Sequence, residues 1–251
     1  MVNKVFTGNT AVVYAAGDLH GDYQSYETIL NIYEKNRKDA LLVFLGDYAD
    51  RGLYGVEIIT ELSRLLDTRD DIVALKGNHE IYRDGRPAFY PCDLINEADR
   101  KVDSWAKFYQ DVMLGFLSKL YIAAIIGKVL FIHAGISSNI HSARDLSNPE
   151  NEKNLLWSDP FHMKGEHKNP RGSGLLFGED ITQKTLSLLG LKMIVRSHEP
   201  YKAAFGPYVE HEGKIVTVNS CTTYGGLRKP FILRIDTATP GYEPIYLNKN
   251  S

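Results

Sequence analysis

Three short polar strings decide the fold of this 251-residue chain: GDLHG at residues 17–21, GDYADRG at 46–52 and GNHE at 77–80. Each string directly follows an apolar run, namely AVVYAA, ALLVFL and DIVALK. An apolar run that stops at glycine predicts a buried strand whose carboxyl end opens into a polar loop. The three strings therefore predict three strands that carry Asp, Asn and His side chains to one rim of a sheet.

The segments between these strings have the periodicity of helices. Apolar residues recur at three- and four-residue spacing over 22–35 and again over 54–66. A β-α-β-α-β pattern of this kind predicts right-handed crossovers and a sheet whose first strands are parallel. Two further helices are expected over 98–119 and 180–189.

The rest of the chain predicts more strands and one long irregular region. The runs YIAAII and KVLFIHAGI flank Gly127 and Lys128 and predict a hairpin with a tight turn. KMIVRSHEP, KIVTVNS and FILRID predict later strands, of which FILRID is expected to be the last. Residues 142–178 lack clear periodicity and are expected to form a long loop. No linker or repeat interrupts the pattern, so we expect residues 1–251 to form a single α/β domain.

The composition excludes several classes of protein. The charge is nearly balanced, with 29 Lys and Arg against 31 Asp and Glu, so no basic field indicates nucleic acid or a membrane as a partner. Two cysteines, Cys92 and Cys221, are too few for a disulfide framework or a four-cysteine zinc site. The N-terminal apolar run is too short to span a membrane and lacks the layout of a secretory signal. We expect a cytoplasmic protein.

The polar side chains at the predicted strand ends can hold two metal ions. Asp18 and His20 are two residues apart and can turn toward one ion, and the two oxygens of Asp47 can bridge it to a second. Imidazole, carboxylate and amide ligands suit two divalent ions, with Mn²⁺ expected and Fe or Zn²⁺ as alternatives, rather than a thiolate site. The residues expected to complete the second site are Asn78, His133 and His198.

Two such ions suit phosphoryl chemistry. Ions about 3.5–4 Å apart can hold a hydroxide between them and bind two phosphoryl oxygens for in-line attack. His79, beside Asn78, is placed to protonate the leaving group. Arg51 and Arg171 are candidates to neutralise the charge of the phosphate.

The five strings GDLHG, GDYADRG, GNHE, HAG and RSHEP, in this order, resemble the motifs of a known family. They are similar to those of the phosphoprotein phosphatase (PPP-type serine/threonine phosphatase) family of the calcineurin-like metallophosphoesterase superfamily. LLWSDP at 155–160 and RGSGLLFG at 171–178 also resemble stretches of its catalytic domains. The resemblance extends from about residue 12 to residue 224. It implies a metallophosphoesterase-type β-sandwich of mixed sheets flanked by helices.

The resemblance implies a role for each matching residue. The two metal sites would be those given above, with Asp47 shared between them. Asp50 would pair with His79 and keep it protonated as the general acid. Arg196, just before the metal-binding His198, would add charge at the rim of the site, and a tyrosine in CTTYGG would lie over it. The residues implied to bind substrate are Arg51, Arg171, Arg196 and Tyr224.

The chain also departs from the family pattern. HAG stands where many eukaryotic members have HGG, and SHEP replaces the more usual AHQ after Arg196. The carboxylate of Glu199 in SHEP is expected to disfavour acidic substrates or to alter the metal preference. The chain begins close to its first motif and ends soon after its last predicted strand, so no regulatory subunit or tail is expected.

Three functions remain open at this point. The first is a protein-serine/threonine phosphatase, which hydrolyses phosphoserine and phosphothreonine monoesters of a phosphorylated protein or peptide. The reaction would proceed by direct attack of a metal-bridging hydroxide. Hydrolysis of phosphotyrosine as well is left open. The second is a hydrolase of dinucleoside polyphosphates such as diadenosine tetraphosphate. Those relatives commonly lack the second Asp of the second motif, whereas Asp50 is present here, which favours the first. The third is a non-catalytic phosphate-binding or scaffold protein, which would need the loss of a metal ligand or of His79, and none of these residues is missing.

Overall fold

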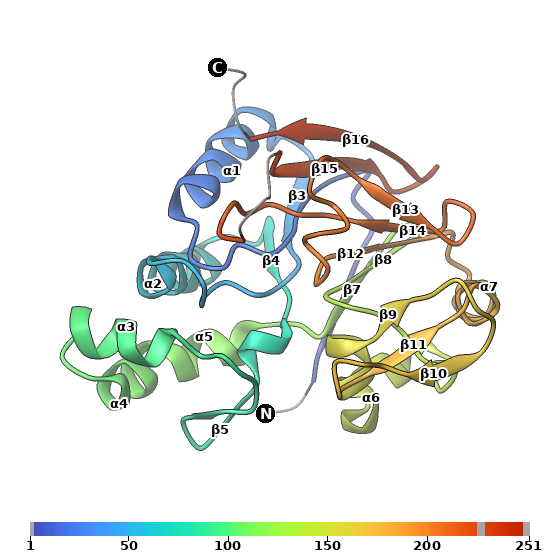
Figure 1. The fold of residues 1–251 in the computed structure, drawn as a ribbon. Helices are drawn as coiled ribbons and strands as arrows, with labels where there is room; N and C mark the ends of the chain where they lie inside the picture. Colours follow the sequence, from blue (N-terminus) through green and yellow to red (C-terminus); the bar gives the residue numbers. More distant parts are fainter. Residues whose placement is uncertain (1–2, 225–228, 248–251) are drawn as a thin grey trace.

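Two β-sheets packed face to face form the framework, with helices on both outer sides (Figure 1). The computed structural model describes residues 3–224 and 229–247. One sheet has five strands in the order β16 (Gly241–Tyr246), β15 (Phe231–Asp236), β2 (Val12–Ala16), β3 (Ala40–Phe44) and β4 (Ile72–Ala74). The other has six, in the order β1 (Val5–Gly8), β7 (Ala123–Ile126), β8 (Val129–Ile132), β12 (Met193–Arg196), β14 (Ile215–Thr217) and β13 (Tyr208–Glu210).

The first third of the chain folds as its pattern predicts. Strands β2, β3 and β4 are parallel neighbours, and helices α1 (Tyr23–Asn36) and α2 (Gly55–Thr68) connect them. The carboxylate of Asp22 accepts the N–H of Ser25 and so caps α1. The first N–H groups of α2 are bound instead by the distant carboxylate of Glu97. Both predicted helices are confirmed to within two residues at each end.

Alternation along the strands divides the apolar core into layers. In β2, Val13 and Ala15 pack between the two sheets, while Tyr14 and Ala16 pack against α1 and α2. On the far side of the six-stranded sheet, a third cluster packs under α6 (Pro149–Trp157) and α7 (Glu179–Leu189). Burial of these apolar surfaces on both faces of each sheet stabilises the sandwich.

The predicted hairpin is confirmed. Strands β7 and β8 are antiparallel around the turn at Gly127, whose φ is 58°. A Cβ atom at Gly127 would lie 2.5 Å from the carbonyl oxygen of Thr237. Glycine is therefore needed both for the left-handed turn and for this close approach.

The single helix expected over 98–119 is wrong. The chain forms α3 (Leu94–Lys101), α4 (Trp105–Phe108), a π-helical turn (Tyr109–Met113) and α5 (Leu114–Lys119). The break after α3 passes through Asp103 at φ 77°, and Ser104 then caps α4 by accepting the N–H of Lys107. Because the pieces on both sides of the break pack on the same core, their apolar spacing continues through it and hides it.

The long loop expected over 142–178 is also wrong. It contains a 3-10 turn (Ala143–Ser147), α6 and a small sheet in the order β10 (Glu166–Lys168), β11 (Leu175–Phe177) and β9 (Asp159–Pro160). Asn148 accepts the N–H of Glu150 and Pro149 occupies the first turn of α6, a helix start that the sequence does carry. The short strands β10 and β11 have no strong alternation to reveal them.

The remaining differences between the predicted and the observed strands lie at the edges of the sheets. FILRID is not the last strand, because β16 follows it and pairs with β15. Strand β1 extends the other sheet beside β7, and a two-stranded ribbon of β5 (Tyr82–Arg83) and β6 (Arg86–Pro87) follows a 3-10 turn (Asn78–Glu80). Within the described ranges, none of the helices combines the length and apolar character that crossing a bilayer requires.

Candidate dinuclear metal centre

The carboxyl ends of strands from both sheets meet at one rim. Asp18 follows β2, Asp47 follows β3 and Asn78 follows β4, whereas His133 and His198 follow β8 and β12 of the other sheet. The rim is joined across the two sheets at Ser197. Its hydroxyl accepts the N–H of Asp18 at 2.8 Å and donates to the carboxylate of Asp18 at 2.6 Å. Asp18 also forms a single parallel bridge with Asn219.

Asp47 lies at the middle of this cluster. Its Oδ2 is 3.5 Å from Nε2 of His20, and its Oδ1 is 3.5 Å from Nε2 of His133. Two groups of ligand atoms converge here, Asp47 with His20 and His79, and Asp47 with His133 and His198. Asp18 is close by, with Oδ2 3.8 Å from Nε2 of His20. A carboxylate with one oxygen toward each group is the arrangement expected of a bridging ligand.

Hydrogen bonds to the backbone orient the imidazoles. Nδ1 of His20 lies 2.8 Å from the carbonyl oxygen of Ala49, and Nδ1 of His133 lies 2.9 Å from that of Leu45. A carbonyl oxygen can only accept, so both Nδ1 atoms donate and both Nε2 atoms present lone pairs to the centre. Burial lowers the pKa of His20 to about 3 and that of His133 well below its usual value. Both rings are therefore neutral, as metal ligands must be.

The polar atoms that remain fit a cation. Nε2 of His133 and Oδ1 of Asn78 are 2.9 Å apart, although the tautomer makes both of them acceptors. Nε2 of His198 is buried without a hydrogen-bond partner among residues 3–224 and 229–247. Burial raises the pKa of Asp47 well above its ordinary value, with the nearby carboxylate of Asp18 adding to the effect. Converging lone pairs and crowded buried carboxylates are both satisfied by divalent cations.

The backbone of the site is held in an uncommon conformation. Half of the ten non-glycine residues described with positive φ lie in the site. Close packing of the loops supports them: a Cβ atom at Gly77 would lie 2.1 Å from Oδ1 of Asp47. Such left-handed residues cost folding energy and persist only where the surroundings enforce them. They are His20, Asp47, Asp50, Arg51 and His198, with φ between 44° and 70°.

Asp50 and His79 form the pair that the motifs predict. Nδ1 of His79 is 2.6 Å from Oδ2 of Asp50, whose side chain is fully buried. Burial alone would lower the pKa of His79, but the carboxylates of Asp47 and Asp50 raise it to about 9. Burial would raise the pKa of Asp50, and its hydrogen bonds to His79 and to two backbone N–H groups hold it below its usual value. The pair is thus an imidazolium and a carboxylate at neutral pH.

Three expected substrate-binding side chains lie around this centre. The Tyr224 hydroxyl is 3.0 Å from Nε2 of His20, and the two rings lie edge to face, so the tyrosine lies directly beside the first group of ligands. The guanidinium of Arg51, an exposed residue, lies 5.5 Å from the centre of the Tyr224 ring. Arg171 is partly exposed, and its Nε donates to Oδ2 of Asp159 at 2.9 Å. The Nη atoms of Arg171 make no hydrogen bond among the described residues, and Nη2 lies 4.0 Å from Oε1 of Glu199.

Arg196 differs from its expected place at the rim. Its side chain has no exposed surface. Nη1 donates to Glu199 at 2.6 Å and Nη2 donates to Asp159 at 3.0 Å. Arg196 is buried because it is the last residue of β12, a strand that is buried on both faces. Arg196 is placed to hold two carboxylates beneath the site and not to face substrate.

Two supporting residues were not assigned from the sequence. Glu80 accepts the N–H groups of Asp47, Tyr48 and Gly77, and so ties the second and third motif loops together. Asp159 holds both Arg171 and Arg196. Glu80 belongs to the motif GNHE and Asp159 to the stretch LLWSDP. A carboxylate within a motif that resembles the family's is the sequence signal that could have indicated a role for each.

Comparison with known proteins agrees with this geometry. A family model described as calcineurin-like phosphoesterase matches residues 11–202. The chain is 31% identical over 242 residues to a probable serine/threonine-protein phosphatase of Encephalitozoon cuniculi, which covers 91% of this chain and 50% of that protein. It is also 31% identical over 227 residues to serine/threonine-protein phosphatase 5 of Arabidopsis thaliana, covering 84% and 40%. The chain spans about half of the length of these curated relatives, or less.

A solved structure has the same fold. A protein serine/threonine phosphatase from Saccharomyces cerevisiae, similar to human phosphatase PP5, matches with a TM-score of 0.76 at 23% identity. The match covers 99% of this chain and 85% of the yeast chain. The expected β-sandwich of mixed sheets with flanking helices is confirmed. Because the family model matches residues 11–202, most of this chain, the chain belongs to the calcineurin-like phosphoesterase family.

Proposed function

We propose that this chain hydrolyses phosphoserine and phosphothreonine monoesters in proteins with the help of two divalent metal ions. The observation that carries the proposal is the 2.6 Å contact between Asp50 and His79, beside the Asp47 carboxylate that lies between two groups of ligands. A serine or threonine alkoxide is a poor leaving group and needs a proton in the transition state. The names of the relatives support the same reaction class.

The donor set supports one assignment of ligands to each ion. Asp18, His20 and Asp47 would hold the first, and Asp47, Asn78, His133 and His198 the second. When bound, the ions supply Lewis-acid charge for the phosphoryl oxygens and for the attacking water. Nitrogen and oxygen donors without thiolate favour Mn²⁺, with iron and zinc as alternatives.

Two arginines bind the phosphoryl group in this proposal. Arg171 is anchored through Nε on Asp159, which leaves its Nη atoms to bind phosphoryl oxygens. Arg51 is an exposed cation whose guanidinium lies 5.5 Å from the centre of the Tyr224 ring, and that ring in turn contacts His20. Guanidinium groups suit this task because their N–H groups bind two oxygens of one phosphate.

His79 supplies the proton. Since Asp50 occupies Nδ1, the nitrogen left to donate is Nε2, and the proton moves from there to the ester oxygen as the P–O bond breaks. Asp50 remains ionised throughout and stabilises the charged ring, which it also holds in one orientation. The water that attacks the phosphorus supplies the oxygen of the released phosphate.

The same pair argues against cleavage of dinucleoside polyphosphates as the main activity. In such anhydrides the leaving group is itself a phosphate, which departs as an anion and gains little from a general acid. An imidazolium fixed by a fully buried carboxylate would therefore contribute little to that reaction. A phenol is an intermediate case, so phosphotyrosine stays within the reach of this site.

A panel of substrates tests the proposal. Purified protein with Mn²⁺ is assayed for phosphate release from phosphoserine, phosphothreonine and phosphotyrosine peptides, and for turnover of diadenosine tetraphosphate. We expect the phosphoserine and phosphothreonine peptides to be hydrolysed, and the Asp47→Asn variant, prepared in the same way, to exclude a contaminating phosphatase. Turnover of diadenosine tetraphosphate alone would refute the proposal.

A further inference from the structure

The carboxylate of Glu199 lies beside three cationic side chains, those of Arg171, Arg196 and Lys202. Its Oε2 is 2.6 Å from Nη1 of Arg196 and 3.0 Å from Nζ of Lys202, and its Oε1 is 4.0 Å from Nη2 of Arg171. The side chain is 13% exposed, so water screens these contacts only in part. Glu199 therefore shares its charge with the outer end of the guanidinium that is proposed to meet phosphate.

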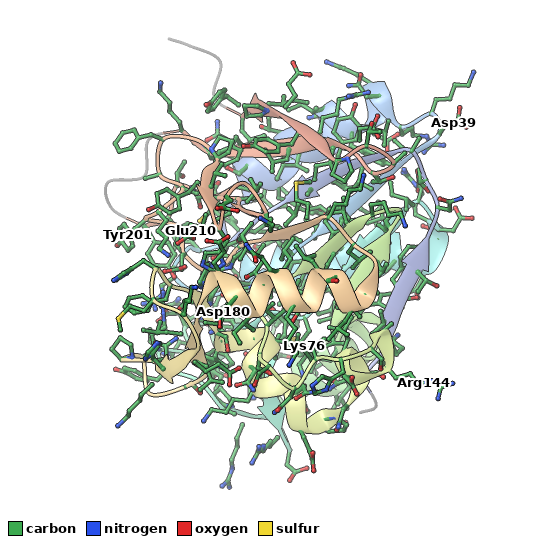
Figure 2. All side chains as sticks on the ribbon, turned by 90° about the vertical axis from the view of Figure 1, so that its right-hand side faces the viewer. Asp39, Lys76, Arg144, Asp180, Tyr201 and Glu210 are labelled. Carbon is green, nitrogen blue, oxygen red and sulfur yellow. The ribbon has the colours of Figure 1, made fainter. Side chains whose placement is uncertain are left out.

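The surrounding network leaves little net positive charge for a ligand. Asp159 pairs with both Arg171 and Arg196, and Glu210 pairs with Lys202 at 2.9 Å. In the view of Figure 2, Glu210 and Tyr201, the residue that precedes Lys202, are labelled on the same side of the molecule. Three cations are thus matched by three carboxylates. Without Glu199, the network would carry one positive charge beside the phosphate position.

We propose that Glu199 is a positioning residue that weakens phosphate binding through Arg171. Asp159 directs the guanidinium from its Nε side, while Glu199 lies on the Nη side, where an incoming phosphoryl oxygen would bind. The carboxylate competes with that oxygen for Nη2 and repels its negative charge. The effect lowers affinity for free phosphate, and hence for the product, and it disfavours acidic groups next to the phosphoester. The inference rests on the proposed function in taking phosphate as the ligand of Arg171.

Neutralising Glu199 isolates this effect. Glutamine has nearly the same shape and can still accept the N–H of Arg196, so the buried guanidinium keeps both partners. A unit charge several ångströms from a phosphate in a partly screened site changes its affinity measurably, and we expect about a threefold to tenfold tighter binding in Glu199→Gln. Glu199→Asp keeps the charge and should stay within about twofold of the native protein.

Glu210→Gln is the matched control. It removes the same charge from Lys202, but Glu210 makes no contact with Arg171 among the ion pairs of the described residues. Phosphate affinity in this variant should change by less than about twofold. A comparable gain in both variants would assign the effect to the overall charge of the network and would overturn the role of Glu199 at Arg171.

The experiment is a calorimetric titration of inorganic phosphate into the Mn²⁺-loaded protein and the three variants. We expect a lower Kd only in Glu199→Gln, and a lower KM of that variant for p-nitrophenyl phosphate without a matching rise in kcat. Loss of structure would instead weaken binding and reduce kcat. Unchanged or weaker phosphate binding in Glu199→Gln overturns the inference, as does the absence of binding in every variant. Because binding is measured without turnover of a phosphopeptide, failure of the proposed function would not by itself produce either result.

Discussion

The carboxylate of Asp50 fixes the imidazole of His79 with one oxygen and the backbone with the other. Oδ2 accepts from Nδ1 of His79 at 2.6 Å, and Oδ1 accepts the N–H groups of Asp93 and Leu94 at 2.6 and 2.8 Å. The ring is therefore tied through Asp50 to the start of α3, which Asp50 reaches across 44 positions of the sequence. Asp50 therefore fixes the orientation of the ring and, together with Asp47, raises its pKa.

Replacing His79 by alanine should affect substrates according to their leaving groups. The serine alkoxide needs a proton, so we expect kcat for a phosphoserine peptide to fall by roughly 100-fold or more. p-Nitrophenolate leaves without one, and its turnover should fall by less than about tenfold. Steady-state kinetics with both substrates checks this, and equal losses on the two would remove His79 from the role of acid.

The rate should fall at alkaline pH. A histidine whose pKa is raised holds its proton below that pKa and loses it as the pH rises through it, and that of His79 is raised to about 9. Bound cations would repel the proton, so we expect the alkaline limb of kcat/KM for a phosphoserine peptide at or below pH 9. Asp50→Asn removes a negative charge beside the ring and should move this limb to lower pH. A limb at the same pH in both proteins would contradict the assignment.

Asp47→Asn should weaken both metal ions together. One oxygen of Asp47 faces His20 and the other faces His133, so the loss of its charge reaches both sites. Metal analysis after gel filtration of the Mn²⁺-loaded protein should show that both ions are lost in parallel. Retention of one full equivalent would mean that Asp47 does not bridge.

Gly77→Ala should disrupt the site from the backbone. The added methyl group would meet Oδ1 of Asp47 at 2.1 Å, and relief requires movement of the carboxylate or of the loop. We expect a loss of metal binding and of about 1–3 kcal/mol of stability in urea unfolding. Gly115→Ala is the control, because nothing lies within 4 Å of its added Cβ in α5. It should stabilise the protein by about 0.5–1 kcal/mol.

Much of the site is local in sequence and so could be predicted. Asp18, Asp47, Asn78, His133 and His198 all follow apolar runs, and the ends of parallel strands meet at one rim. The chain therefore carries both the ligand types and their convergence within short strings. The same locality explains why α1, α2 and the β7–β8 hairpin were predicted well.

The supporting network could not be predicted in this way. Asp159 and Arg196 are 37 positions apart, and no local pattern states that they pair or that the arginine is buried. The sequence also does not reveal the break at Asp103 or the strand β16, because tertiary packing overrides the local sequence pattern at both places. Sequence periodicity reports which face is apolar, and it does not report where the chain bends along that face.

The left-handed residues of the site have a consequence for how this protein can evolve. At Arg51, with φ 70° and an exposed side chain, glycine would relieve about 1 kcal/mol of backbone strain while little packing is lost. Arg51→Gly should therefore unfold at a higher urea concentration and bind phosphate more weakly. Under the proposed role of Arg51 in binding phosphate, selection for stability and selection for the reaction act in opposite directions at this position.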